Sequence, residues 1–99
     1  MTFFIANRAE RQILTLEGSV TIREARNLAA LLNDSLVEGA PLDIETARLD
    51  DIDTCILQLL CSLKKTAPEF TFVDTSAVFL SAVDRSQLRR ALLGVRENL

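Results

Sequence analysis

The sequence predicts a mixed α/β fold, and three observations lead to it. Short segments in which apolar and polar residues alternate recur along the chain, and longer segments with the apolar spacing of amphipathic helices lie between them. Helix start and stop signals bracket the longer segments. The chain has 99 residues, of which 48% are hydrophobic, and this is enough for one core but not for two. We therefore expect one domain over residues 1–99.

Two strands and a helix are expected first. "TFFIA" (2–6) and "QILTLEG" (12–18) have the composition and alternation of strands, with a polar turn between them. "TIREARNLAALLNDSLVEG" (21–39) has an apolar stripe at helical spacing. Its first four residues fit a capping box, and Gly39 followed by Pro41 predicts its end.

A strand, a helix and another strand are expected in the middle of the chain. "PLDIET" (41–46) alternates, and "EFTFVD" (69–74) places two phenylalanines on one face. Between them, a leucine-rich helix is predicted from about Thr54 to Thr66, where it stops before Pro68. Two lysines in its last turn suit the negative end of the helix.

Two short helices are expected to close the chain, with Ser76 and Ser86 as their N-caps and Gly94 at the end of the last. The predicted order is ββαβαβαα, with about four strands in one mixed sheet. Strands in a parallel sheet that is covered on both faces are continuously apolar, whereas these strands alternate. We therefore expect the helices mainly on one face of the sheet and a more polar, partly open opposite face.

Composition argues against a nucleic-acid or membrane partner. The net charge is −3 and the five phenylalanines are the only aromatic residues. The chain therefore has little excess positive charge to neutralise phosphates and few aromatic rings on which bases could stack. No apolar run approaches the roughly 20 residues that span a bilayer, and the first ten residues lack the basic region of a signal peptide. We expect a cytoplasmic protein without direct membrane insertion.

The two cysteines favour a reducing compartment. Cys55 and Cys61 are six residues apart in one predicted helix, which places them on roughly opposite faces. This spacing excludes a disulfide between them and does not resemble a metal site. Buried, reduced thiols in a cytoplasmic protein are the favoured interpretation.

Candidate binding residues gather where the strands end, because sites in open α/β sheets form beyond the carboxyl ends of the strands. Residues 18–21, 50–55 and 74–77 all belong to this edge. Thr21, Thr54 and Ser76 lie there at three predicted helix starts. Serine and threonine are ordinary N-cap residues, so capping alone explains Thr21 and Ser76.

Thr54 differs because Asp50, Asp51 and Asp53 come just before it. Asp53 alone suffices to cap the helix, which leaves the Thr54 hydroxyl in the first turn and open to solvent. A phosphate there would add about −1.5 to −2 charges; the helix start would favour it and the carboxylates would oppose it. From the residues alone, two hypotheses stay open: a phosphorylation switch, and simple capping beside solvated acids.

An enzyme is not expected. The chain has no histidine, and no set of nucleophile, base and orienting residue is visible. The acidic residues near Thr54 come from one loop, which does not make the acidic pair and strand-end lysine of a phospho-aspartate receiver. We expect no catalytic residue, no cofactor and no dedicated metal site. Weak Mg²⁺ binding by Asp50, Asp51 and Asp53 stays open as an alternative, since carboxylates are oxygen ligands that suit this ion.

Two stretches of the sequence resemble STAS domains, the family named after sulphate transporters and anti-sigma factor antagonists. "LEGSVTIREARNL" is similar to the strand-to-helix motif of the family. "LDIETARLDDIDTCILQLLCSLKK" is similar to its signature strand, followed by Asp-Ser/Thr at the start of a leucine-rich helix. The resemblance extends from about Gln12 to Leu92 and implies a STAS-like fold.

The resemblance also implies a non-enzymatic bacterial protein that binds a regulatory partner. Antagonist members are phosphorylated on the residue directly after the Asp of this motif, which is Thr54 here. Their unphosphorylated form binds an anti-sigma factor kinase, and phosphorylation releases it, so that partner switching regulates transcription. The chain departs from the antagonists at Ile56, where the family usually has Gly, and at Thr21, where many have Asp.

These departures, together with Thr in place of Ser at position 54, keep an alternative open. Other STAS relatives are the small, ATPase-binding subunit of bacterial lipid-transport ABC complexes, and chemotaxis-associated proteins, which need no phosphorylation. We expect a monomer or weak dimer under either hypothesis. The predicted partner-binding residues are Thr21, Asp51, Asp53, Thr54, Cys55, Ile56, Thr75 and Ser76.

Overall fold

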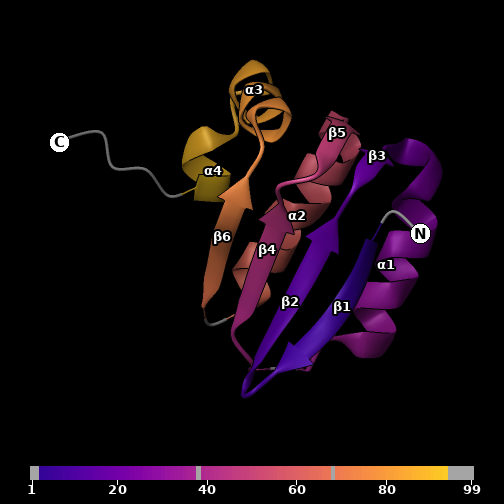
Figure 1. Ribbon diagram of the computed structural model, residues 1–99, viewed down its shortest axis with the longest axis vertical. Helices are drawn as coiled ribbons and strands as arrows, with labels where there is room; N and C mark the ends of the chain where they lie inside the picture. The colour runs from indigo at the N-terminus through magenta and orange to yellow at the C-terminus, as the bar shows by residue number, and fades with distance from the viewer. Residues whose placement is uncertain (1–2, 38, 68, 94–99) are drawn as a thin grey trace, which may run out of the picture.

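The computed structural model describes residues 3–37, 39–67 and 69–93, which form a mixed α/β domain (Figure 1). Expectations that concern Thr2, Pro68 and Gly94 lie outside these residues. The elements in chain order are β1 (Phe3–Arg8), β2 (Arg11–Leu16), β3 (Gly18–Val20), α1 (Ile22–Ser35), β4 (Leu42–Thr46), β5 (Leu49–Ile52), α2 (Thr54–Thr66), β6 (Phe70–Thr75), α3 (Ala77–Arg85) and α4 (Arg89–Leu93).

The main sheet has four strands in the order β1-β2-β4-β6. β1 and β2 form an antiparallel hairpin, whereas β4 pairs in parallel with both β2 and β6. The hairpin turn includes Ala9, which has a φ of 55°, a left-handed conformation that is uncommon outside glycine. The predicted four-stranded mixed sheet is therefore confirmed.

A second, two-stranded parallel sheet pairs β3 with β5, and it was not predicted from the sequence. Gly18 supplies the backbone conformation that starts it, with a φ of 67°, which a side chain would strain. Its N–H donates to the carbonyl of Arg48 at 2.9 Å. The strands have only three and four residues, too few for an alternating pattern to be read. This small sheet carries Asp50 and Asp51, which were expected in a loop.

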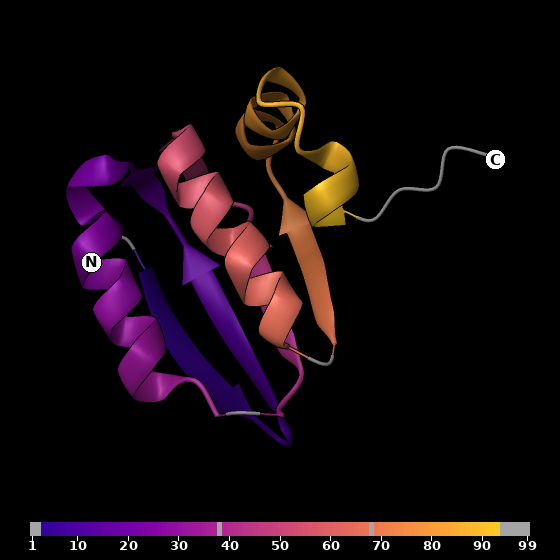
Figure 2. The same ribbon diagram turned by 180° about the vertical axis from the view of Figure 1, so that it is seen from behind.

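α1 and α2 lie over one face of the main sheet (Figure 2), as predicted. α3 lies beyond the end of the sheet at which β4 and β6 finish, and α4 lies beside β6 (Figure 1). The core is aliphatic apart from phenylalanines of β1 and α3, and burial of each large side chain contributes about 1.5–3 kcal/mol. Its fully buried residues include Leu14, Leu16, Leu28, Leu42, Ile44, Ile56, Leu57, Leu60, Phe79 and Leu92.

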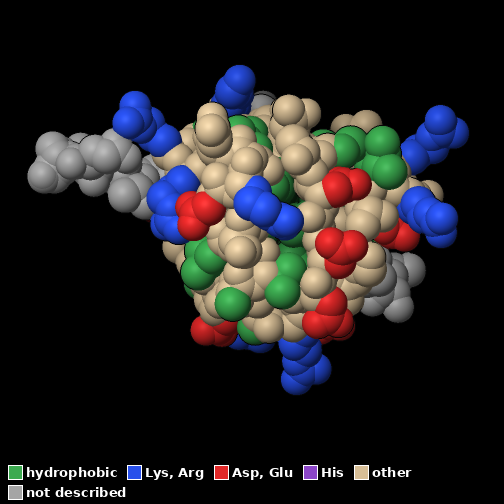
Figure 3. All heavy atoms as spheres, turned by 90° about the horizontal axis from the view of Figure 1, so that it is seen from above, with side chains coloured by type: hydrophobic (Ala, Val, Ile, Leu, Met, Phe, Trp, Pro, Cys, Tyr) green, Lys and Arg blue, Asp and Glu red, His purple; other side chains and the backbone are tan. Residues whose placement is uncertain are grey.

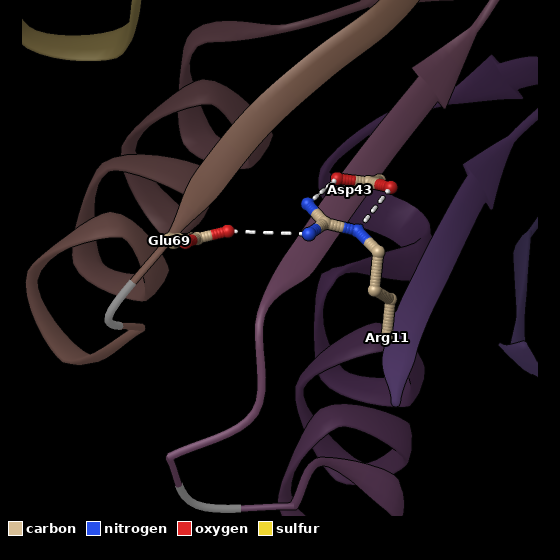
Figure 4. Close-up of polar contacts among 3 residues, drawn as sticks. All are labelled: Arg11, Asp43 and Glu69. Carbon is tan, nitrogen blue, oxygen red and sulfur yellow. Dashed lines mark hydrogen bonds and ion pairs between the residues drawn. The ribbon is translucent and has the colours of Figure 1, made fainter. Parts of the chain in front are cut away.

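The opposite face of the sheet is more polar, as expected, and carries an ion-pair cluster across three segments (Figure 4). Arg11 Nε and Nη2 donate to the two oxygens of Asp43 at 3.1 and 2.6 Å, and Nη1 donates to Glu69 at 3.1 Å. These hydrogen bonds raise the pKa of Arg11 above its ordinary value. The Arg11 side chain is 40% exposed, so the cluster adds little stability.

α1 ends earlier than the sequence predicts, because Gln12 reaches its carboxyl end. The Gln12 side chain is buried, donates to the Ser35 carbonyl at 2.8 Å and accepts from Val37 N–H at 2.9 Å. Leu36 is extended and its N–H donates to Leu32. The side chain of a distant strand thus ends the helix before Gly39 can.

The expected limits of α2 are confirmed, whereas the expected role of Ser86 is wrong. Ser76 caps α3, its hydroxyl accepting from Phe79 N–H at 3.1 Å. Ser86 is the C-cap of that same helix, with its N–H donating to Ala82. α4 begins only at Arg89, after a turn in which Gln87 has a φ of 59°.

Candidate functional site

Three helix ends meet at the edge of the molecule where β4 and β6 finish. They are the amino ends of α1 and α2 and the carboxyl end of α3, and the hydrogen bonds that join them involve Asp53 and Thr54. Figure 3 shows the molecule from above this edge, where acidic, basic and apolar side chains are interspersed. We call the residues Ile22, Asp53, Thr54 and Ser86 the helix-end cluster.

Asp53 caps two helices with one carboxylate. Its Oδ1 accepts from Ile56 N–H at 3.2 Å in its own helix, and its Oδ2 accepts from Ile22 N–H at 2.7 Å at the start of α1. The first bond follows the ordinary N-cap geometry and was expected. The second joins residues 31 positions apart, so no local pattern predicts it. Asp53 is half-buried, and each of its carboxylate oxygens accepts from an amide at a helix start.

Thr54 is exposed in the first turn of α2. Its Oγ1 lies 3.2 Å from the Oγ of Ser86, and either hydroxyl can donate this hydrogen bond. Because Asp53 supplies the cap, the Thr54 hydroxyl is not used to begin its helix. The expectation that the hydroxyl is open to solvent agrees with its exposure, but the contact with Ser86 was not foreseen.

Asp50 and Asp51 are both exposed in β5. Neither forms an ion pair with another described residue. Over the described part of the chain, no three His, Cys, Asp or Glu side chains are grouped as a metal site would require. With the Asp53 carboxylate engaged by two amides, the three aspartates do not act as one acidic cluster.

The other predicted site residues have distinct surroundings. Thr21 is half-buried in a capping box, its N–H donating to Glu24 Oε1 at 2.9 Å. Cys55 is exposed with a free thiol, so the expectation that it is buried is wrong. Thr75 and Ser76 are half-buried at the end of β6 and the start of α3.

Ile56 requires a correction, because its side chain is 0% exposed and belongs to the core. It has no surface to offer a partner, and only its backbone N–H, bonded to Asp53, takes part in the site. A β-branched residue at this position therefore fills the interior under the helix start and does not obstruct the surface. The other cysteine, Cys61, is half-buried, and this burial raises its pKa.

A separate apolar hollow of about 520 Å³ lies between the carboxyl-terminal halves of α1 and α2. Leu32, Leu36 and Leu59 are among the residues that line it. It is remote from the helix-end cluster, and its walls are mainly aliphatic. This hollow was not predicted from the sequence.

The helix-end cluster offers hydroxyl groups, one shared carboxylate and helix amino ends. These groups suit hydrogen bonding to another protein or to an anionic group. Within the described residues, no helix is both long enough and apolar enough to cross a membrane.

Comparison with known families gives a match over most of the chain. The family model described as "Mlab, STAS domain" matches residues 3–95. No curated protein matches the chain.

Proposed function

The chain belongs to the STAS-domain family, and on this premise we propose that it is a regulatory subunit that docks on an ATPase-type protein through a surface centred on Thr54. STAS domains are generally non-enzymatic binding domains that act by protein–protein interaction. The proposed docking surface consists of Thr21, Asp51, Asp53, Thr54, Cys55, Thr75 and Ser76.

The observation that carries this proposal is that Asp53, and not Thr54, caps the helix starts. The Asp53 carboxylate accepts the amides that begin two helices, while the Thr54 hydroxyl is held at the surface. A residue that the fold does not need for capping, displayed on a rigid helix start, is well placed for recognition.

The first candidate for the partner is a kinase-like anti-sigma factor, as the resemblance to antagonists implies. A phosphate on Thr54 would lie at the positive end of α2, which stabilises it by about 0.3–1 kcal/mol at an exposed site. The fold would therefore tolerate the phosphate. A partner surface that fits the neutral hydroxyl would be opposed by its charge and volume, so phosphorylation would release the partner.

Binding to a purified ATPase-type protein, either a kinase-like anti-sigma factor or the ATPase of a lipid-transport ABC complex, tests the proposal. We expect Thr54→Glu and Thr54→Lys each to weaken binding by about 30-fold or more, the effect of an interface hot spot of about 2 kcal/mol. Calorimetric titration with the purified partner measures this. The control is Ser62→Lys, an exposed position of the same helix, which should bind as the unmodified chain does.

The two variants carry opposite charges, so their common loss of binding would identify the position rather than one sign of charge. Circular dichroism and thermal melting should show both variants folded. A folded Thr54→Lys variant with unchanged affinity would overturn the proposed docking surface.

A second candidate is a constitutive subunit that holds an ABC-type ATPase in shape and is not phosphorylated. The contact between Thr54 and Ser86 favours it, because the hydroxyl already has a structural partner and needs no phosphate to be useful. Incubation of the chain with its ATPase partner and ATP, followed by intact-mass measurement, separates the two candidates. A gain of one phosphate that Thr54→Val abolishes supports the switch; an unchanged mass in a bound complex supports the constitutive subunit.

A further inference from the structure

The Thr54–Ser86 hydrogen bond joins two elements that are distant in sequence. Thr54 opens α2, and Ser86 ends α3, 32 positions later, with 3.2 Å between their hydroxyl oxygens. The positive amino end of one helix thus faces the negative carboxyl end of another, an arrangement that favours both dipoles.

Ser86 begins a tight corner between α3 and α4, which we define as residues 86–88. Gln87 adopts a φ of 59°, which a non-glycine residue sustains only when its surroundings hold it there. The Gln87 N–H donates to Asp84 at 3.1 Å, and the Leu88 N–H donates to Val83 at 3.0 Å. The corner is therefore a strained segment held by a few hydrogen bonds.

The far side of the corner is anchored more firmly. Leu92 is 1% exposed, and its carbonyl accepts from Lys64 Nζ of α2 at 3.2 Å. Arg89 forms a two-pronged hydrogen bond with Asp84, at 2.7 and 2.9 Å. Any change at Ser86 should consequently remain within the corner and leave α4 docked.

A group attached to Thr54 Oγ1 would compete for the space that the Ser86 hydroxyl occupies. An oxygen 3.2 Å away leaves room for one shared proton but not for a phosphoryl group between the two atoms. Esterification also removes the proton that Thr54 contributes, so only Ser86 can still donate. Either Thr54 turns away or the corner shifts, and in both cases the original contact is lost.

We propose that Ser86 is a positioning residue that couples the state of the Thr54 hydroxyl to the α3–α4 corner. The corner then changes its shape when Thr54 is modified. A partner that covers both Thr54 and the corner therefore meets a changed side chain and a changed backbone. This inference rests on the proposed function, since it describes how the same site is regulated.

Amide NMR spectra of the isolated full chain test the coupling without a partner. We expect Thr54→Glu to shift the amides of Gln87 and Leu88, whereas Thr54→Ser, which keeps the hydroxyl, should leave them near their original positions. The amides of Leu14 and Ile44, which are buried in the main sheet, should be unaffected and report that the fold is intact.

Removal of the Ser86 hydroxyl supplies the decisive comparison. In a Ser86→Ala background, the shifts that Thr54→Glu causes at Gln87 and Leu88 should fall to the level of amides remote from the site. Ser86→Thr, which restores a hydroxyl, should restore the shifts. Ser81→Ala, a matched change at an exposed serine of α3, should have no such effect.

Corner shifts of equal size with and without the Ser86 hydroxyl would overturn the inference. This result is distinguishable from failure of the proposed function. The corner shifts concern the isolated chain, whereas the docking proposal fails when Thr54→Lys binds its partner normally.

Discussion

Asp53 illustrates how one side chain organises the site. Aspartate before a leucine-rich helix predicts an N-cap, and the bond to Ile56 N–H agrees with it. The bond to Ile22 N–H depends on where α1 begins in space, which no local pattern contains. The exposure of Thr54 follows from this arrangement, because a capping residue already precedes it.

Loss of the Asp53 carboxylate should destabilise both helix starts. We expect Asp53→Ala to lower the free energy of unfolding by about 1–3 kcal/mol, since a lost N-cap costs about 0.5–2 kcal/mol. Asp53→Asn keeps one acceptor and should cost less. Urea unfolding measures the total loss of stability in each variant. Hydrogen exchange at the Ile22 and Ile56 amides shows how much of that loss belongs to each helix start. Unchanged exchange at Ile22 in Asp53→Ala would contradict the bond between the helices.

Thr46 presents the opposite case, a buried hydroxyl without a hydrogen bond among the described residues. Its side chain is 0% exposed, and Oγ1 has no partner. An unsatisfied buried group costs about 1–3 kcal/mol. We therefore expect Thr46→Val, which keeps the shape, to raise the free energy of unfolding by about 1 kcal/mol. Thr46→Ala, which leaves a cavity, is the control and should gain less stability than Thr46→Val. A valine variant less stable than the unmodified chain would show that the Thr46 hydroxyl does have a hydrogen-bond partner.

Among the elements, only the two short strands β3 and β5 were not predicted, although the limits of some predicted helices differ from the structure. The limits predicted for α2 agree with the structure because its cap, its apolar stripe and its last-turn lysines all indicate the same helix. β3 and β5 escaped prediction because pairing with each other, rather than their own pattern, makes them strands. The end of α1 was misplaced because the side chain that stops it belongs to β2.

The α3–α4 corner should respond to acid through Asp84. Hydrogen bonds from Arg89 hold the pKa of Asp84 below its ordinary value of 3.8. A carboxyl group whose pKa is lowered by folding stabilises the fold above the unfolded pKa, and this contribution is lost as the pH falls through the folded value. The loss therefore belongs to the acid range below pH 3.8.

Arg89→Met removes the partner and should raise the pKa of Asp84 towards its ordinary value. NMR titration of the Asp84 carboxyl group in both proteins measures the difference. Equal values would show that the ion pair does not persist in solution. Because both side chains are about half exposed, at 54% and 42%, only a small effect on stability is expected.

For the molecule as a whole, alternation along the strands was the informative property. It indicated one covered and one open face, and α1 and α2 do cover a single face (Figure 2). The order of strands and helices predicted which edge of the sheet carries the candidate site. The sequence does not predict which side chains at that edge face solvent. Ile56 is buried, and Ser86 belongs to the candidate site although it was not predicted there, because both facts depend on how α2 and α3 pack.

The carboxylate shared by α1 and α2 limits how this segment can be reused in protein engineering. A transplant of residues 49–66 into another scaffold would carry Thr54 with its own helix, but Oδ2 of Asp53 would lose the amide it holds at 2.7 Å. The recipient would need a second helix beginning at the same place, so the transferable unit is a pair of chain segments.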